Sequence, residues 1–106
     1  MRAGRLRHRI TIQQPVITRD GTGESLETWG AFAVVWAAVE PLRGREMFAA
    51  QEMHSEITTR IRLRYLAGID TTMRVLFEGR TFLIIHPPID PEMRHVELQL
   101  MCKEIW

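Results

Sequence analysis

Residues 56–65, EITTRIRLRY, constrain the fold more than any other stretch, because apolar and polar side chains alternate along them. A β-strand places successive side chains on opposite faces, whereas a helix would spread the arginines around its circumference. The β-branched residues also favour a strand. The stretch therefore predicts a half-buried strand whose second face meets water or a partner. The apolar parity holds Ile57, Thr59, Ile61, Leu63 and Tyr65, and the other holds Thr58, Arg60, Arg62 and Arg64.

The same alternation predicts two strands near the ends of the chain. Residues 6–13, LRHRITIQ, predict the first, and we expect Pro15 to close it. Residues 94–103, RHVELQLMCK, predict the last, with Met101 as an exception to the alternation. The inward positions of that last strand are predicted to be Val96, Leu98, Leu100 and Cys102.

Two short alternating runs joined at Glu78 and Gly79 predict a β-hairpin. Pro87 and Pro88 follow the second run and forbid its continuation as a central strand. The first run points Met73, Val75 and Phe77 one way. The return run leaves two choices for the core side, either Thr81, Leu83 and Ile85 or Phe82 and Ile84.

Residues 29–39 form the most apolar part of the chain, and neither parity is polar. A strand with this pattern must be covered on both faces. In so small a domain, one face can line the core, and the other needs a helix or a neighbouring subunit. A buried helix also fits the periodicity and stays open as an alternative.

The remaining segments predict one loop and one helix. Residues 17–28 hold a cluster of turn formers without periodicity, which predicts a mobile loop or a long hairpin tip. After Pro41 and Gly44, the segment REMFAAQEM favours a short helix whose Met47, Ala50 and Met53 form a core-facing stripe. Six strands, one short helix and no βαβ pattern predict a mainly antiparallel, all-β fold. We expect a single domain over residues 1–106, a small six-stranded barrel or sandwich with long loops.

Few residues suggest chemistry. The four histidines, His8, His54, His86 and His95, show no metal-ligand spacing, and Cys102 lies on an apolar parity where a buried thiol is ordinary. The acidic residues give no sign of a shared catalytic pocket. We therefore expect no catalytic, cofactor or metal site. Lacking an apolar run of roughly 20 residues and a signal-peptide pattern, the chain is expected to be made and used in the cytoplasm, with no membrane partner.

The feature that remains is a basic strand face. Arg60, Arg62 and Arg64, with Arg7 and Arg9, follow alternate positions and are candidates for contact with nucleic-acid phosphates. Nucleic-acid barrels usually interleave exposed aromatic residues for base stacking, and none lies among these arginines. A solvated face or salt bridges between subunits is the competing interpretation, and a nucleic-acid-binding module is kept as the alternative function.

Taken in order, the segments resemble one family. GRLRHRITIQ, a glycine-containing loop ending at Trp29, VWAAVEPLRGREMFAAQ, ITTRIRLRY, MRVLFEGRTFLII and VELQLMCKE together resemble the bacteriophage head-tail joining proteins, also called head-completion, adaptor or stopper proteins. The resemblance covers nearly the whole chain and rests on the order and spacing of the segments. The chain departs from it locally at Pro87, Pro88 and Pro91, which stiffen the connection before the last strand.

The resemblance implies a non-enzymatic structural protein of a phage or prophage virion. Copies would form a ring below the portal, close the DNA-filled head and offer a surface to the tail, after assembly in the bacterial host cytoplasm. Expected partners are other copies, the portal or adaptor ring, tail proteins and packaged DNA in the channel. The candidate contacts are Arg7, Arg9, Arg19, Asp20, Glu24, Arg43, Arg45, Arg60, Arg62 and Arg64.

Overall fold

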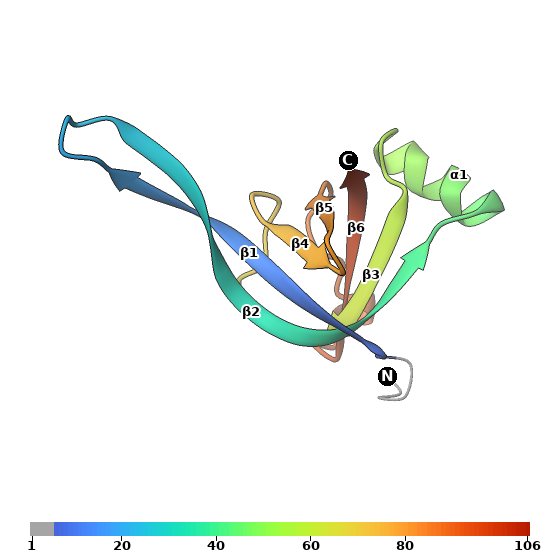
Figure 1. Ribbon diagram of the computed structural model, residues 1–106. Helices are drawn as coiled ribbons and strands as arrows, with labels where there is room; N and C mark the ends of the chain where they lie inside the picture. The colour runs from blue at the N-terminus through green and yellow to red at the C-terminus, as the bar shows by residue number, and fades with distance from the viewer. Residues whose placement is uncertain (1–5) are drawn as a thin grey trace.

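The computed structural model describes residues 6–106, which form six antiparallel strands and one α-helix. Figure 1 shows the strands wrapped around a core, with one pair extending well beyond it. In chain order the elements are β1 (His8–Arg19), β2 (Ser25–Pro41), α1 (Gly44–Met53), β3 (Thr59–Arg64), β4 (Arg74–Phe77), β5 (Arg80–Ile84), a 3-10 turn η2 (Pro91–Met93) and β6 (Glu97–Ile105).

The strands close into a barrel in the order β1-β2-β3-β6-β5-β4, with β4 pairing back onto β1. The predicted alternation of β3 is confirmed, since Ile61 and Leu63 are buried while Arg62 lies between them on the outer face. Closure lets small strands share one interior without leaving open edges there. The largest fully buried interior side chains come from five of the strands: Ile10, Ile12, Ile61, Leu63, Val75, Phe82, Ile84 and Leu100.

The predicted hairpin of β4 and β5 is also present. Phe77 pairs with Arg80, and the connecting Glu78 and Gly79 both have positive φ, as a tight hairpin turn with this twist requires. Of the two choices left open for β5, Phe82 and Ile84 face the core. Leu83 is only partly buried.

β1 and β2 continue past the barrel as a two-stranded ribbon, which we call the arm: residues 14–30. Its strands pair from Gln14 with Gly30 to Arg19 with Ser25, whereas β1 pairs with β4 only at residues 11–13. In Figure 1 the arm runs to the upper left and ends in the blue turn. The molecule is therefore elongated, measuring 50 × 29 × 27 Å.

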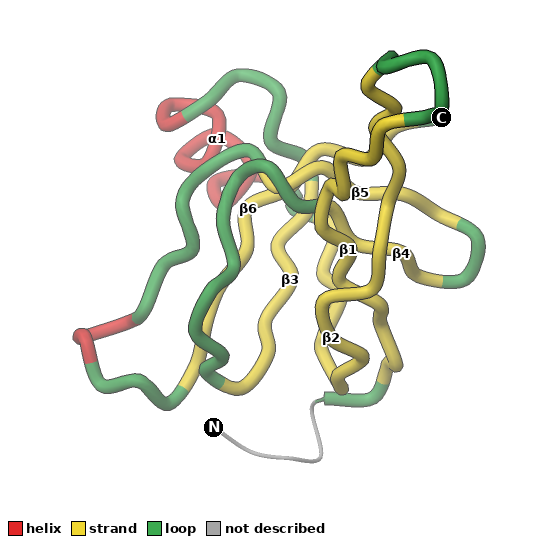
Figure 2. Tube along the Cα trace, turned by 90° about the vertical axis from the view of Figure 1, so that its left-hand side faces the viewer, coloured by secondary structure: helices red, strands yellow, loops and turns green. Residues whose placement is uncertain are grey.

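α1 lies beside the barrel rather than over β2. It buries Ala50 against Leu42, Ile57 and Met101. Figure 2 shows the helix near one end of the barrel and the connection carrying η2 near the other. The helix therefore explains why an apolar Met101 interrupts the alternation of β6. Its side chain lies outside the barrel interior and is covered by the cluster around α1.

One sequence-based expectation was wrong, and two open alternatives are decided by the structure. Pro15 does not close β1, because past Gln13 that strand pairs on one side only, an edge setting that tolerates proline. Residues 17–28 are mostly paired strand, so the hairpin alternative holds and only the tip is a turn. The helix alternative for residues 29–39 also fails, because β2 spans them.

Three predicted inward positions are exposed. Tyr65 follows the end of β3 and stacks on His95 with ring centroids 4.4 Å apart, and its side chain is 36% exposed. Val96 precedes β6 and is also exposed. Met53, at the last turn of α1, is exposed whereas Ala50 is buried, so the methionine stripe is buried only in part.

Candidate interaction surfaces

Two of the three arginines on the basic face of β3 are paired with carboxylates of the same chain. Arg62 donates to both carboxylate oxygens of Glu40, at 3.0 and 2.7 Å, and also approaches Glu97 at 3.5 Å. Arg60 donates to Glu40 at 3.0 Å and lies 3.7 Å from Glu46. Bidentate charged contacts of this kind hold a guanidinium in place. These ion pairs lie within one chain. Arg60 and Arg62 therefore have charged partners without a nucleic-acid phosphate or a neighbouring subunit.

The pKa values of this cluster follow from the same contacts. Desolvation raises the pKa of the Glu40 carboxyl, but hydrogen bonds and charges from Arg62 and Arg60 outweigh it and leave the pKa below its usual value. The hydrogen bonds that Arg62 donates to Glu40 in turn raise the pKa of Arg62. Glu40 and Arg62 are thus both ionised at neutral pH.

An apolar groove of about 610 Å³ lies next to this cluster, on the outer face of β2. Val34 is 50% exposed and Trp36 is 52% exposed, so residues 6–106 do not supply the full cover expected for this face. Tyr65 contributes a second aromatic ring to the lining. The complete lining is Leu6, Val34, Val35, Trp36, Arg64, Tyr65 and Leu66.

Two arginines flank Trp36. Arg9 pairs directly opposite it in the β1–β2 ladder, and the Arg9 guanidinium lies 5.2 Å from the ring centroid. The β2–β3 ladder ends at Ala37 opposite Leu63, so the next position in register places Arg64 beside Trp36. Among residues 6–106, Arg9 and Arg64 have no carboxylate within ion-pair distance. The groove is therefore apolar in its floor and cationic at its rim.

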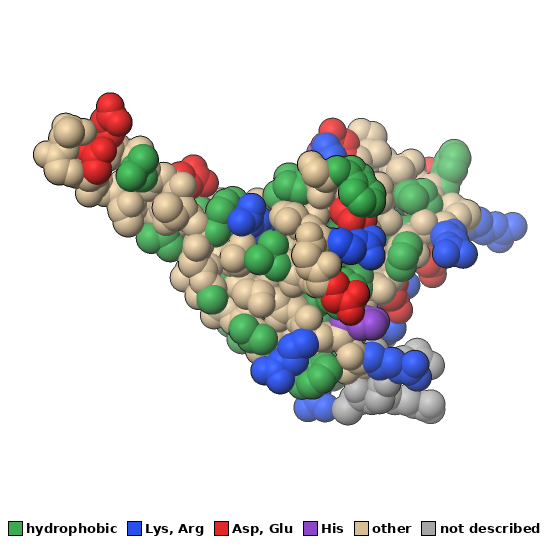
Figure 3. All heavy atoms as spheres, in the orientation of Figure 1, with side chains coloured by type: hydrophobic (Ala, Val, Ile, Leu, Met, Phe, Trp, Pro, Cys, Tyr) green, Lys and Arg blue, Asp and Glu red, His purple; other side chains and the backbone are tan. Residues whose placement is uncertain are grey.

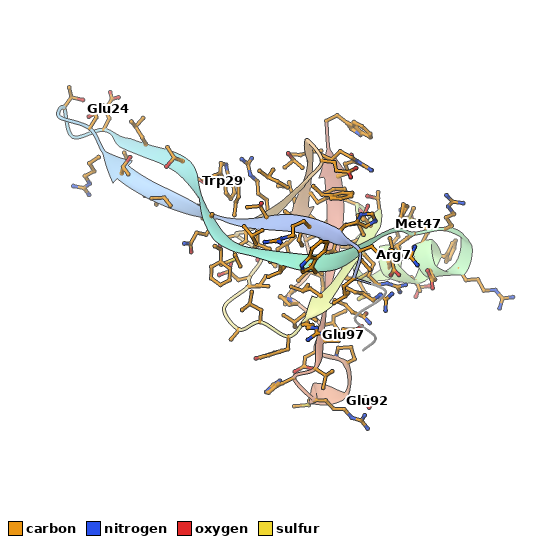
Figure 4. All side chains as sticks on the ribbon, turned by 60° about the horizontal axis from the view of Figure 1, so that its bottom comes forward. Arg7, Glu24, Trp29, Met47, Glu92 and Glu97 are labelled. Atoms are coloured by element: carbon orange, nitrogen blue, oxygen red, sulfur yellow. The ribbon has the colours of Figure 1, made fainter. Side chains whose placement is uncertain are left out.

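The arm carries the opposite charge. Its tip is held by Asp20, whose Oδ1 accepts hydrogen bonds from the backbone N–H groups of Thr22 and Glu24 at 2.9 and 3.1 Å. Hydrogen bonds to Thr22 lower the pKa of this exposed carboxyl, which is therefore ionised. Figure 3 shows acidic side chains at the far end of the arm, and Figure 4 places Glu24 there. Ile17, 72% exposed, and Leu26, 49% exposed, lie on the paired strands behind the tip.

The candidate contacts named from the sequence therefore fall into separate regions. Arg19, Asp20 and Glu24 lie on the arm; Arg7, Arg9 and Arg64 lie near the groove end of the barrel; Arg43 and Arg45 lie at the start of α1; and Arg60 and Arg62 lie in the carboxylate cluster. The sequence-based reasoning missed Glu40, Trp36 and Tyr65. Only the register, which sets Glu40 opposite Arg60 and Trp36 opposite Arg9, would have found the first two.

The described residues offer little for catalysis. Cys102 is fully buried, and its burial raises the thiol pKa, so the thiolate nucleophile is suppressed. Within residues 6–106 no group of three or more His, Cys, Asp or Glu side chains could hold a metal ion. In the same residues, no helix has the length and apolar character needed to span a bilayer.

Known proteins match this chain over most or nearly all of its length. A family model described as phage head completion protein matches residues 1–105. The chain is 27% identical to head completion protein gp7 of Enterobacteria phage HK97, across 97% of this chain and 96% of that protein. It is 31% identical to head completion protein gp16 of Bacillus phage SPP1, across 76% and 74%.

Two solved structures share the fold. The solution structure of protein SF1141 from Shigella flexneri 2a superposes with a TM-score of 0.79 at 37% identity, covering 98% of this chain and 96% of that one. A chain in the virion of a native gene transfer agent particle gives a TM-score of 0.61 at 19% identity, covering 95% and 96%. At that identity the second likeness concerns the fold alone.

Proposed function

The chain belongs to the phage head completion protein family, and we propose that its copies form a ring below the portal. Membership makes it a structural protein of a phage or prophage virion, located at the head-tail junction and in contact with other virion proteins. In the proposal, the ring closes the DNA-filled head as a stopper and offers the tail its attachment surface as an adaptor. Residues 1–106 act as one domain, without catalysis or a cofactor.

The observation that carries the proposal is how much apolar surface projects from so small a barrel. Trp36 lies open on the outer face of β2, Ile17 on the arm and Phe48, 74% exposed, on α1. A monomeric protein seldom leaves several such groups uncovered, and clustered exposed apolar residues mark contact sites. The three surfaces lie on different sides of the chain, as contacts with two neighbouring copies and with a further ring require.

The alternative of a nucleic-acid-binding module is less favoured. Its central residues, Arg60 and Arg62, already bind carboxylates. Contact with packaged DNA in the channel remains part of the proposal, and we assign it to Arg43 and Arg45 at the start of α1. Both side chains are exposed, and neither forms an ion pair with any residue between 6 and 106.

Deleting the gene from the phage or prophage that encodes the chain tests the role at the junction. Electron microscopy of the lysate should show filled or leaking heads beside free, complete tails, and a plasmid copy of the gene should restore joined particles. Normal joined virions without the protein would overturn the proposal. Averaged images of the restored junction test the ring itself, since they should show a ring-shaped layer between portal and tail that is absent without the protein.

A further inference from the structure

We infer that the arm of one copy docks into the Trp36 groove of the next, and that this contact builds the ring. The inference rests on the ring proposed above and names the surfaces that join its subunits. The groove floor is formed by Val34 and Trp36, with Tyr65 beside them and Arg9 and Arg64 at its rim. The occupant is the arm, residues 14–30, of a second copy of this chain.

The arm has little support from the rest of its own chain and would gain stability from a partner. It extends beyond the barrel by six residue pairs, Gln14 with Gly30 to Arg19 with Ser25, or about 20 Å at the rise of a strand. A two-stranded ribbon without a further layer is marginally stable in water. Ile17 and Leu26 belong to adjacent residue pairs and so lie on opposite faces of the ribbon, and both are exposed. A ribbon that is apolar on both faces fits a groove better than a flat surface.

The charges of arm and groove are complementary. The arm holds three acids and one arginine, which gives a net charge of −2: Asp20, Glu24, Glu27 and Arg19. Among residues 6–106, none of those three acids forms an ion pair, and the same holds for Arg9 and Arg64 at the groove. Complementary unpaired charges steer association and fix register. Most other ion-pairing groups on the barrel, such as Arg62 and Arg80, already have carboxylate partners in their own chain.

The position of the two surfaces excludes contact within one chain. The arm and the groove lie on the same strand, β2, and Trp36 is 11 residues from Ser25, about 36 Å along an extended strand. Figure 1 shows the arm continuing β2 away from the barrel, so the arm cannot fold back onto the groove of its own chain. A surface at one end that matches a different surface at the other makes a head-to-tail contact, which closes into a ring when the rotation between copies allows.

The contact is tested by disulfide trapping in particles assembled from full-length variants. Ile17→Cys and Leu26→Cys, one on each face of the arm, are each combined with Val34→Cys in the groove. The native Cys102 is fully buried, so we expect it to form no disulfide in these variants. After mild oxidation, at least one pair should give a ladder of multiples of the chain mass on a non-reducing gel, and each single cysteine variant should give none.

Three results would overturn the inference. In the first, both double variants are incorporated normally, as a reducing gel would measure, but give no ladder. That result would reject the arm-to-groove contact and leave the proposed ring unaffected. Dimers from Val34→Cys alone would mean that the groove meets a second groove across a two-fold axis. A bond from an arm cysteine to a virion protein of another mass would give the arm a different partner. Particles that join tails without any copy of the chain would instead overturn the proposed function.

Charge reversal tests the recognition separately. Arg64→Glu or Glu27→Arg in a cysteine-pair variant should lower the ladder yield about tenfold, and the two together should restore it, because the exchanged charges at positions 27 and 64 again attract each other across the contact. Arg19→Glu is the matched control, since it makes the same substitution but leaves the arm more acidic, so the yield should be kept or raised. Unchanged yields in both single reversals would show that these charges do not guide the contact.

Discussion

Glu40 on β2 binds Arg62 on β3 through both carboxylate oxygens, although the two residues are 22 positions apart in the chain. The same carboxylate accepts a hydrogen bond from Arg60, so one acid compensates two arginines of the outer face. Replacing Glu40 with Gln should lower the free energy of unfolding at pH 7 by about 1–2 kcal/mol, because two partly buried guanidinium groups lose their charged acceptor. Urea unfolding measures the loss.

The same pair gives a pH dependence. Because the pKa of Glu40 in the folded chain is lowered from its ordinary 4.5, its contribution to stability is complete above about pH 4.5 and disappears as the pH falls through the lower, folded-state value. The difference in unfolding free energy between the wild type and Glu40→Gln should therefore shrink in acid. Glu46→Gln is the control, since Glu46 is 62% exposed and lies 3.7 Å from Arg60, and it should change stability by less than about 0.5 kcal/mol.

Gly79 has a φ of +77° in the turn between β4 and β5. Gly79→Ala should cost about 1–2 kcal/mol of unfolding free energy, because a Cβ disfavours this backbone conformation even though no neighbouring atom blocks it. Gly21→Ala at the tip of the arm, where φ is not positive and no atom lies within 4 Å of the added Cβ, should be nearly neutral. Equal losses at both sites would contradict this account of the turn.

Cys102 should react with thiol reagents only when the chain unfolds. Its side chain is fully buried on β6, and burial raises its pKa, so the thiolate is scarce at neutral pH. Labelling with an aromatic disulfide should be slow in buffer and rapid in urea, with a rise that follows the unfolding transition. Fast labelling of the folded chain would show that the barrel opens near β6.

Trp36→Ala should separate assembly from stability. The side chain is about half exposed, so we expect the unfolding free energy to change by less than about 1 kcal/mol. Tryptophan in an apolar recess is a typical interface anchor, so the yield of joined particles in the complementation assay should fall about tenfold or more. Trp36→Phe should recover most of that yield, and full activity of Trp36→Ala would count against the groove as a contact site.

Much of the barrel could be predicted because alternation reports directly on burial. Ile61 and Leu63 alternate with arginines, and the structure buries the first two and places the arginines on the outer face. Alternation fails where one strand changes its surroundings along its length. β2 lines the barrel at Ala37 but forms an open ribbon at Leu26, and no local pattern marks the change.

The candidate surfaces were harder to predict because they depend on register. The arginines of β3 looked like a free basic face until the ladder placed Glu40 opposite Arg60. The groove is built from three separate segments that include Leu6, Trp36 and Tyr65, and their meeting depends on how the barrel closes. Each segment alone has an ordinary composition, so the sequence could indicate the arginines but not which of them stays unpaired.

Closure of the barrel also has a consequence for how the protein is stored before use. Every barrel strand is hydrogen-bonded on both sides over at least part of its length, and β4 pairing with β1 seals the ring. Unpaired strand edges invite chains to stack on one another and aggregate, and here the described residues leave the longest such edges along residues 14–36 of β1 and β2. Two unassembled chains therefore cannot add strand to strand across the closed part of the barrel, and any such pairing is restricted to the open edges of β1 and β2.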